Sequence, residues 1–167
     1  AATSVVQYGL SEGTLNNESN DATNVVNHSI VLTGLDAGTT YYYRVSSNDG
    51  VNTVTFPDPG DSALVFVMPP GITTSPASQS VCPATEVTFT SAAFSDTTLT
   101  VQWQISTDSG VNWADSIGAT NNAITFIASK ADDGKQFRAV WTNAGGDNIS
   151  DTANLTIKDT SFSITNI

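Results

Sequence analysis

The sequence has 167 residues, enough for two small β-domains of roughly 80 to 100 residues each. Its formal net charge is −11, and its five basic residues are scattered, which excludes the basic patch that nucleic-acid binding needs. A single cysteine, Cys82, and a single histidine, His28, exclude an intramolecular disulfide and a four-ligand zinc site. No apolar run approaches the roughly 18 residues of a membrane-spanning helix, so we expect no membrane insertion.

The first 68 residues contain three strand-like segments, "SVVQYG", "SIVLTGLDAGTTYYYRV" and "SALVFVM". They are rich in the β-branched and aromatic residues that favour strands. The segment "VNTVTFPDPGD" between the last two is expected to form either an extended hairpin or a long loop.

The middle segment carries a family pattern. Leu35, Gly38, Thr39 and Tyr41 match the sequence Leu-x-Pro-Gly-Thr-x-Tyr, with Ala37 in place of the proline, and so resemble strand E, the corner and strand F of a fibronectin type III domain. The resemblance implies that "SVVQYG" is strand C and "SALVFVM" strand G. It also implies that Tyr41 is a buried corner tyrosine whose hydroxyl bonds to nearby backbone.

On this mapping, strands A and B of the first sandwich are missing from the chain. Two strands contribute about five inward side chains, each worth roughly 1.5 to 3 kcal/mol of burial. That sum equals the typical stability of a small domain, roughly 5 to 15 kcal/mol. We therefore expect something else to cover the open face.

A domain boundary is expected at "VMPPGITTSP", where paired prolines and a glycine interrupt the strand patterns. We place a short, stiff linker at residues 69–75.

Downstream, residues 76–158 alternate apolar and polar side chains in several short segments. "EVTFTSAA", "LTVQWQIS", "ADDGKQFRAVWTNAGG" and "SDTANLTI" resemble strands B, C, F and G of an immunoglobulin-like domain, as in tandem repeats of large bacterial surface proteins. The resemblance implies that Trp103 is the core tryptophan of strand C. Ser91 and Ala139 stand at the positions of the family's inter-sheet disulfide, and Phe137 replaces its corner tyrosine.

The segment "STDSGVNW", Ser106 to Trp113, resembles the "Asp box" hairpin found in sialidases and other glycan-handling β-propellers. A propeller would need several copies, and this chain has one. We expect a tight turn between two strands, in which Asp108 accepts backbone hydrogen bonds, Gly110 adopts positive φ and Trp113 covers the hairpin.

Two aromatic residues and four aspartates are the candidate binding residues. A carbohydrate-binding surface would use Trp113 and Tyr42, although packing against a neighbouring strand is the alternative role for both. No cofactor is expected apart from calcium, for which the loops "PDPGDS" and "ADDG" offer Asp58, Asp61, Asp132 and Asp133. Turn formation is the alternative role of these aspartates.

The sequence contains no recognisable set of catalytic residues. His28 is the one base available for nucleophilic catalysis, it stands at the expected start of strand E, and no nucleophile-elbow pattern occurs. The first domain also resembles the leading module of purple acid phosphatases, but here an immunoglobulin-like module follows where their metal-bearing domain would stand. We therefore expect a protein that is not an enzyme.

Together these observations predict an all-β protein of two tandem antiparallel β-sandwiches. Residues 1–68 form an incomplete fibronectin type III-like sandwich, 69–75 a linker, 76–158 an immunoglobulin-like sandwich, and 159–167 a spare strand or the start of a following module. The resemblance implies a non-catalytic structural or adhesive module of a larger extracellular or cell-surface microbial protein.

Its expected partners are neighbouring domains, copies of the same protein, or glycans. The missing strands allow either a piece of a longer chain or a filament built by strand complementation. The alternative functions are an accessory carbohydrate-binding or spacer module of a secreted hydrolase, and a phage or virus fibre component.

Overall fold

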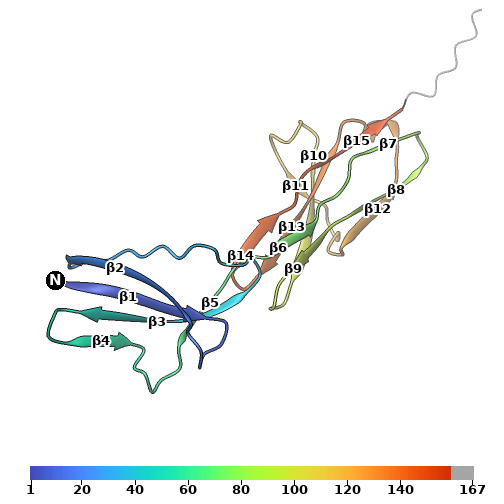
Figure 1. The fold of residues 1–167 in the computed structure, drawn as a ribbon. Helices are drawn as coiled ribbons and strands as arrows, with labels where there is room; N and C mark the ends of the chain where they lie inside the picture. Colours follow the sequence, from blue (N-terminus) through green and yellow to red (C-terminus); the bar gives the residue numbers. More distant parts are fainter. Residues whose placement is uncertain (159–167) are drawn as a thin grey trace, which may run out of the picture. The chain divides into compact units, whose positions relative to one another are not determined.

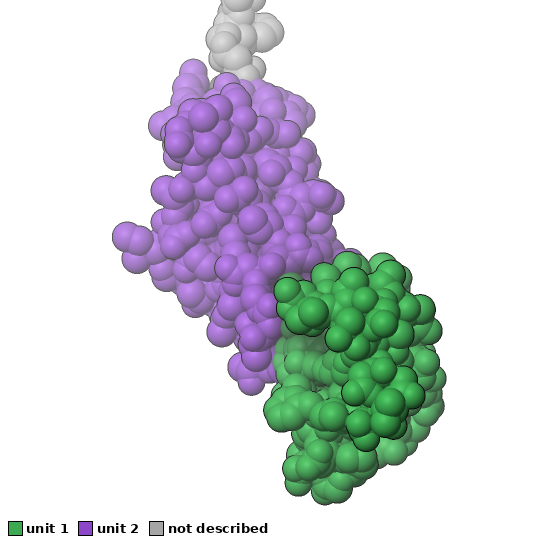
Figure 2. Space-filling model, turned by 90° about the vertical axis from the view of Figure 1, so that its left-hand side faces the viewer, with its two compact units in different colours: residues 1–69 green, residues 70–167 purple. Residues whose placement is uncertain are grey.

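The computed structural model describes residues 1–158 and divides the chain into two compact units, Ala1–Pro69 and Pro70–Ile167 (Figures 1 and 2). Strands make up 52% of the described residues. Among the described residues, helical structure is limited to one 3-10 turn at Lys130–Asp132. The all-β class is therefore confirmed, while the expected strand at 159–167 lies outside the described residues.

Unit 1 is built on one antiparallel sheet. Its strand order is β2-β1-β3-β4, with β5 also paired to β3 (Figure 1). The strands are β1 (Ala2–Gly9), β2 (Asn17–Val25), β3 (Thr40–Asn48), β4 (Thr53–Phe56) and β5 (Leu64–Val67). The segment "VNTVTFPDPGD" contains β4, which forms a hairpin with β3, so of the two expected forms the hairpin is the one observed.

One face of this sheet carries the aromatic side chains. Tyr8 lies opposite Tyr43, and Tyr41 lies opposite Phe66, so the four rings share one side of the sheet. The Tyr41 and Phe66 rings stack with centroids 5.5 Å apart, and Phe66 meets Tyr43 edge-on at 5.6 Å. This cluster is the centre of the apolar face.

No second sheet covers the apolar face within the described residues. Phe56 lies opposite Val45 on this face, and Phe56 and Val54 are 64% and 68% exposed. Tyr41, at 5% exposure, is the only large hydrophobic side chain of unit 1 that is buried in the described structure. Unit 1 is thus one sheet of an incomplete sandwich.

The strand expected at "SIVLT" is not formed: residues 26–39 run outside the strands. Strand E of a fibronectin type III domain pairs with a second sheet, and without that partner its N–H and C=O groups have no ladder to join. Val31 is accordingly 76% exposed.

Unit 2 is a two-layer sandwich. One layer has the order β11-β10-β13-β15-β7, with β14 also on β13; the other consists of the pairs β12-β8 and β6-β9. The strands are β6 (Gly71–Thr74), β7 (Gln79–Val81), β8 (Glu86–Thr90), β9 (Ala92–Phe94), β10 (Thr100–Ser106), β11 (Ala114–Asp115), β12 (Ala123–Ile127), β13 (Gln136–Asn143), β14 (Gly146–Ile149) and β15 (Ala153–Ile157).

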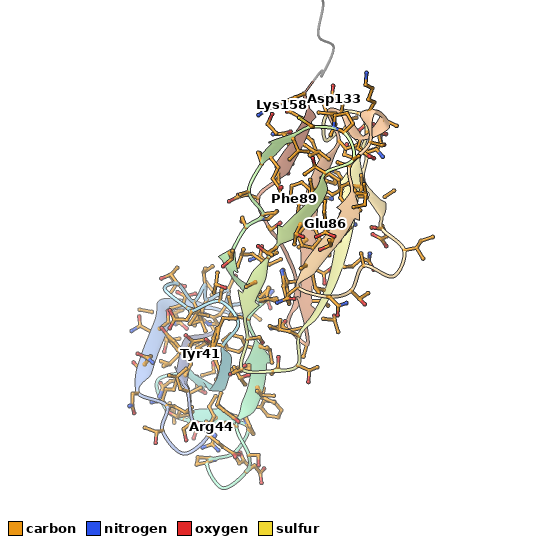
Figure 3. All side chains as sticks on the ribbon, turned by 90° about the vertical axis from the view of Figure 1, so that its right-hand side faces the viewer. Tyr41, Arg44, Glu86, Phe89, Asp133 and Lys158 are labelled. Atoms are coloured by element: carbon orange, nitrogen blue, oxygen red, sulfur yellow. The ribbon has the colours of Figure 1, made fainter. Side chains whose placement is uncertain are left out.

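The two layers meet in a closed hydrophobic core. Phe89 of β8, labelled in Figure 3, stacks on Phe137 of β13 with ring centroids 4.4 Å apart. Trp103 and Leu155 are fully buried beside them. The strands that form this core are the ones in which apolar and polar residues alternate in the sequence.

Part of the expected linker belongs to unit 2. Gly71–Thr74 forms β6, which pairs with β9 in one layer, and β7 pairs in parallel with β15 in the other. Pro76, which lacks an N–H to donate to a ladder, stands between β6 and β7. The first strand of unit 2 therefore changes layer at this proline, which adds one parallel pair to a sandwich expected to be antiparallel.

Candidate binding site at the Ser106–Trp113 turn

The turn between β10 and β11 is held by two side chains. Ser106 Oγ donates to Asp108 Oδ1 at 2.8 Å and accepts from the Gly110 N–H at 2.9 Å. Asp108 also accepts from the Asn112 backbone N–H at 2.8 Å and from Asn112 Nδ2 at 2.6 Å. These bonds, first the one from the Asn112 backbone, lower the pKa of Asp108 from its ordinary value.

The backbone of the turn needs two residues with positive φ. Gly110 has φ +86° and Ser109 has φ +59°. A Cβ on Gly110 would lie 2.8 Å from Gln136 Oε1, the end of a flexible side chain that can shift, so it is the positive φ that favours glycine at this position.

Trp113 follows the turn and is fixed on two sides. Its Nε1 donates to Gly110 O at 3.1 Å, and the Arg138 guanidinium lies 4.1 Å from the centre of its ring. This distance is that of a cation–π contact. Partial burial lowers the pKa of Arg138, yet a guanidinium stays charged at ordinary pH.

A row of polar side chains continues from Arg138 across the outer face of the sheet. Arg138 Nε donates to Gln104 Oε1 at 2.9 Å, and Gln104 Nε2 donates to Asp115 Oδ1 at 2.9 Å. Gln104 lies opposite both Arg138 and Asp115 in the strand register, so the three side chains share one face. A hollow of about 300 Å³ adjoins this row and is lined in part by Trp113 and Asp115.

Tyr42, the second aromatic candidate, lies in unit 1. It is half-buried on β3 opposite Val65, on the face of the sheet away from Tyr41 and Tyr43. Trp113 and Tyr42 belong to different units, and each is considered by itself.

Tyr41, labelled in Figure 3, lies on β3, directly after the 26–39 segment. Its hydroxyl accepts a hydrogen bond from the Asp36 N–H at 3.0 Å, and the ring is 5% exposed. The phenol thereby ties an irregular segment to the sheet.

Trp103 and Phe137 lie in the core of unit 2. Trp103 is fully buried, and its Nε1 donates to Asn121 O at 2.8 Å. Ser91, at one of the two positions where the immunoglobulin family often carries a disulfide, accepts from Trp141 Nε1 at 2.9 Å. A hydrogen bond and the Phe89–Phe137 stack thus connect the layers without a covalent bridge.

Two of the four candidate calcium ligands are engaged with protein donors. Asp132 accepts from Lys135 Nζ at 2.7 Å and from Ser129, and Asp133 Oδ1 accepts from the Ile157 N–H at 2.7 Å. Asp58 and Asp61 lie in an exposed loop. No group of three or more acidic, histidine or cysteine side chains that could hold a metal occurs among the described residues.

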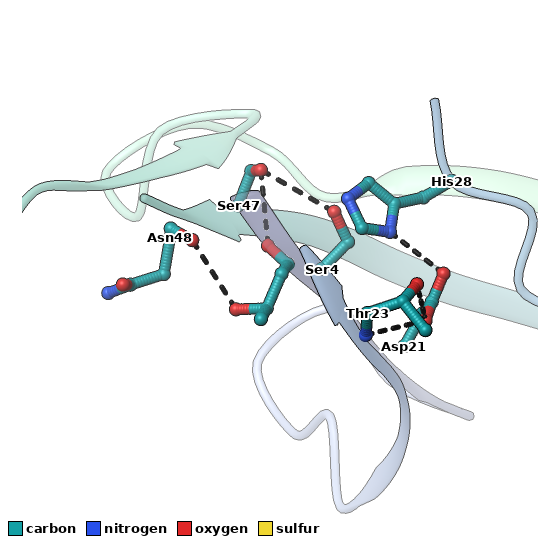
Figure 4. Close-up of polar contacts among 7 residues, drawn as sticks. Ser4, Asp21, Thr23, His28, Ser47 and Asn48 are labelled. Atoms are coloured by element: carbon teal, nitrogen blue, oxygen red, sulfur yellow. Dashed lines mark hydrogen bonds and ion pairs between the residues drawn. The ribbon is translucent and has the colours of Figure 1, made fainter. Parts of the chain in front are cut away.

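His28 lies in the irregular segment instead of opening a strand. Its Nδ1 is 2.9 Å from Asp21 Oδ2, and Asp21 Oδ1 accepts from the backbone N–H and the hydroxyl of Thr23 (Figure 4). The Thr23 bonds, followed by His28, lower the pKa of Asp21 to about 2. The pair ties residues 26–39 to β2.

Arg44 is a structural residue that sequence reasoning missed. It donates from Nη1 to Pro59 O at 3.4 Å and from Nη2 to Asp61 O. Its partners are backbone carbonyls, which no residue pattern encodes, and so no signal in the sequence could have identified the contact.

Within residues 1–158, the structure contains no helix with the length and apolar character of a membrane span.

The two units match different family models. Residues 1–57 match the family described as the N-terminal domain of purple acid phosphatase. Residues 71–159 match the family described as "Domain of unknown function (DUF8696)". The chain is 36% identical over 89 residues to Endoglucanase C of Cellulomonas fimi. This match covers 53% of this chain and 8% of that protein.

Similar solved structures include two tandem immunoglobulin modules. The N-terminal Ig1-2 module of the Drosophila receptor protein tyrosine phosphatase DLAR has a TM-score of 0.45 at 18% identity, covering 77% of this chain and 66% of that one. The IG1+IG2 structure of DIP-gamma has a TM-score of 0.44 at 11% identity, covering 93% and 84%. The match over residues 71–159, more than half of the chain, shows that the chain belongs to the family described as "Domain of unknown function (DUF8696)".

Proposed function

We propose that this chain is a non-catalytic structural or adhesive module of a larger extracellular protein on a microbial surface. The observation that carries the proposal is the single sheet of unit 1, whose apolar face bears Phe56 and Val54 at 64% and 68% exposure. An exposed apolar face of this kind marks a surface against which a neighbouring element packs. The function of unit 1 is therefore to join a partner.

In this proposal, the acidic residues stabilise the fold. Asp49 accepts hydrogen bonds from the Val51 and Asn52 N–H groups, Asp108 holds the β10–β11 turn, and Asp132 pairs with Lys135. Carboxylates used as turn acceptors stay ionised, which suits a rigid spacer and not a general acid.

The partner that we favour is a strand from a second copy of the chain. Residues 159–167 alternate Phe162 and Ile164 with polar neighbours, and Asp159 is their one charged residue, which limits repulsion between chains of net charge −11. Pairing of this segment with the open sheet would give a filament or lattice by strand complementation.

Light scattering over a wide concentration range tests the assembly. We expect the mass to rise with concentration, and to stay that of a monomer after deletion of 159–167. A control in which Gly and Ser replace Phe162 and Ile164 keeps the length of the segment and should also remain monomeric. A wild-type chain that is monodisperse and monomeric at every concentration contradicts the strand-complementation proposal.

A second candidate function is an accessory module of a secreted hydrolase. It is supported by the 36% identity to Endoglucanase C, of which the match covers 8%. Fusion of the chain to a cellulase catalytic domain tests it: an accessory binding module should raise the rate on insoluble cellulose and leave the rate on a soluble substrate unchanged. Equal rates on insoluble cellulose with and without the chain would exclude an accessory module that acts on cellulose.

A further inference from the structure

We propose that the hollow beside Trp113 is a binding site for one ring of a neutral glycan. This inference rests on the second candidate function and names its site and its class of ligand. The hollow measures about 300 Å³, and Trp113, Ile105 and Ala114 give it an apolar part, while Asp108, Asn112 and Asp115 give it a polar part. That volume is at the lower end of the range of small-molecule sites.

The indole has a free surface toward the hollow. Arg138 lies 4.1 Å from the ring centre, yet it does not line the hollow. The hollow therefore adjoins a part of the ring that the guanidinium leaves open. An apolar C–H face of a sugar can pack there as other apolar groups pack on aromatic rings.

The site is organised before any ligand arrives. The bond from Trp113 Nε1 to Gly110 O, together with the Arg138 contact, fixes the indole. The bonds from Asn112 to Asp108 fix the turn below it, and the bond from Gln104 fixes the carboxylate of Asp115. A ligand then binds without the entropic cost of ordering these side chains.

The charges of the lining select the ligand. Asp108 and Asp115 are the charged side chains of the hollow, which repel an anionic sugar. Asp115 Oδ1 accepts from Gln104, whereas Oδ2 has no donor within the described residues and can accept from a hydroxyl. A cationic ligand on the indole would meet the charge of Arg138, 4.1 Å from the ring centre, while Asp108 and Asp115 already accept from Asn112 and Gln104, which weakens their attraction for a cation. A neutral polyhydroxylated ring satisfies all three conditions.

Titration calorimetry with the whole chain tests the site. The probes are cellohexaose and mannohexaose as neutral glycans, hexagalacturonate as an anionic glycan and hexalysine as a cationic peptide. We expect binding of a neutral hexasaccharide, no comparable binding of the two charged probes, and a loss of about tenfold in affinity for Trp113→Ala. Asp115→Ala should also weaken binding, because it removes the free acceptor.

The control is Asp147→Ala, which removes a carboxylate that accepts from Thr142 Oγ1 on another hairpin. It should bind as the wild type does, and thermal melting of every variant checks that unit 2 stays folded. Trp113→Phe provides a second variant that keeps an aromatic surface and should retain part of the affinity.

Three outcomes overturn the site: neither neutral probe binds, a charged probe binds more tightly, or Trp113→Ala binds as the wild type does. If a neutral hexasaccharide binds equally well to wild type and Trp113→Ala, the accessory function holds and the site lies elsewhere. The same follows if the fusion raises the rate on cellulose although no hexasaccharide binds. Failure of both the titration and the fusion experiment removes the accessory function itself.

Discussion

Asp108 and Asp21 each hold a short piece of backbone through hydrogen bonds to their carboxylate oxygens. Asp108 closes the β10–β11 turn through Asn112, and Asp21 holds Thr23 and His28 at the edge of unit 1. In both cases the ionised carboxyl is the better acceptor, so its pKa is lowered.

Replacement of Asp108 by Ala should lower the melting temperature of unit 2 by a few degrees. The change removes the acceptor of two bonds from Asn112 and one from Ser106. Asp108→Asn, which keeps one acceptor oxygen, should lose less. An unchanged melting temperature for Asp108→Ala would show that the turn does not depend on this side chain.

Unit 1 should lose stability in acid through Asp21. Its pKa falls from 3.8 to about 2 on folding, so its contribution is complete above 3.8 and is lost as the pH drops toward 2. Carbon-detected NMR titration of the carboxyl should give the low pKa directly. In Asp21→Asn, the pH dependence of unit 1 between these values should flatten; an identical acid limb in wild type and variant would contradict the assignment.

At the scale of elements, the two units differ in how their strands find partners. In unit 2, β8 and β12 face β10, β13 and β15 across a closed core, whereas in unit 1 the 26–39 segment has no sheet to join. A few side-chain contacts hold that segment, among them the bond from the Asp36 N–H to the Tyr41 hydroxyl.

Substitution of Phe for Tyr41 should therefore loosen this segment selectively. The loss of one hydrogen bond is worth about 0.5 to 1.5 kcal/mol. Hydrogen exchange at the Asp36 amide should accelerate, with little change in β3. Tyr42→Phe is the matched control, because the Tyr42 hydroxyl makes no hydrogen bond within the described residues; equal acceleration in both variants would refute the role of the Tyr41 hydroxyl.

For the whole molecule, two units with such different cores should unfold separately. Unit 2 has a core of ten buried residues, while unit 1 buries Tyr41 alone among its large hydrophobic side chains in the described structure. Calorimetry should show two transitions, and a chain of residues 70–158 should retain the higher one. A single cooperative transition of the whole chain would contradict independent unfolding.

The sequence anticipates the parts of this fold that are encoded locally or by alternation. Val87 and Phe89 mark β8, and Trp103 and Ile105 mark β10, because their inward positions repeat every second residue. β2, with the sequence "NESNDATNV", has no such pattern because its side chains remain largely exposed, and it was not predicted.

Contacts between residues that are distant in the sequence, or that lie in irregular segments, could not be predicted either. The strand expected at "SIVLT" has the right residues and lacks a partner sheet, which no local pattern reveals. At the candidate site, Asp108, Gly110 and Trp113 lie within one turn and can be chosen from spacing alone. Arg138 and Asp115 reach the same site through strand register, which the sequence does not state.

The parallel pairing of β7 with β15 has a mechanical consequence. β7 lies near the start of unit 2 and β15 near its described end, and their register joins Leu155 to Gln79 and Ile157 to Val81. A tensile force applied at residues 70 and 158 first loads β6, which is paired with β9; once that pair separates, the force pulls β7 and β15 in opposite directions along their length. The hydrogen bonds between them run across the strands, so they are sheared together instead of being opened one at a time. Unit 2 is therefore built to resist stretching along the direction in which a chain of such modules would be pulled.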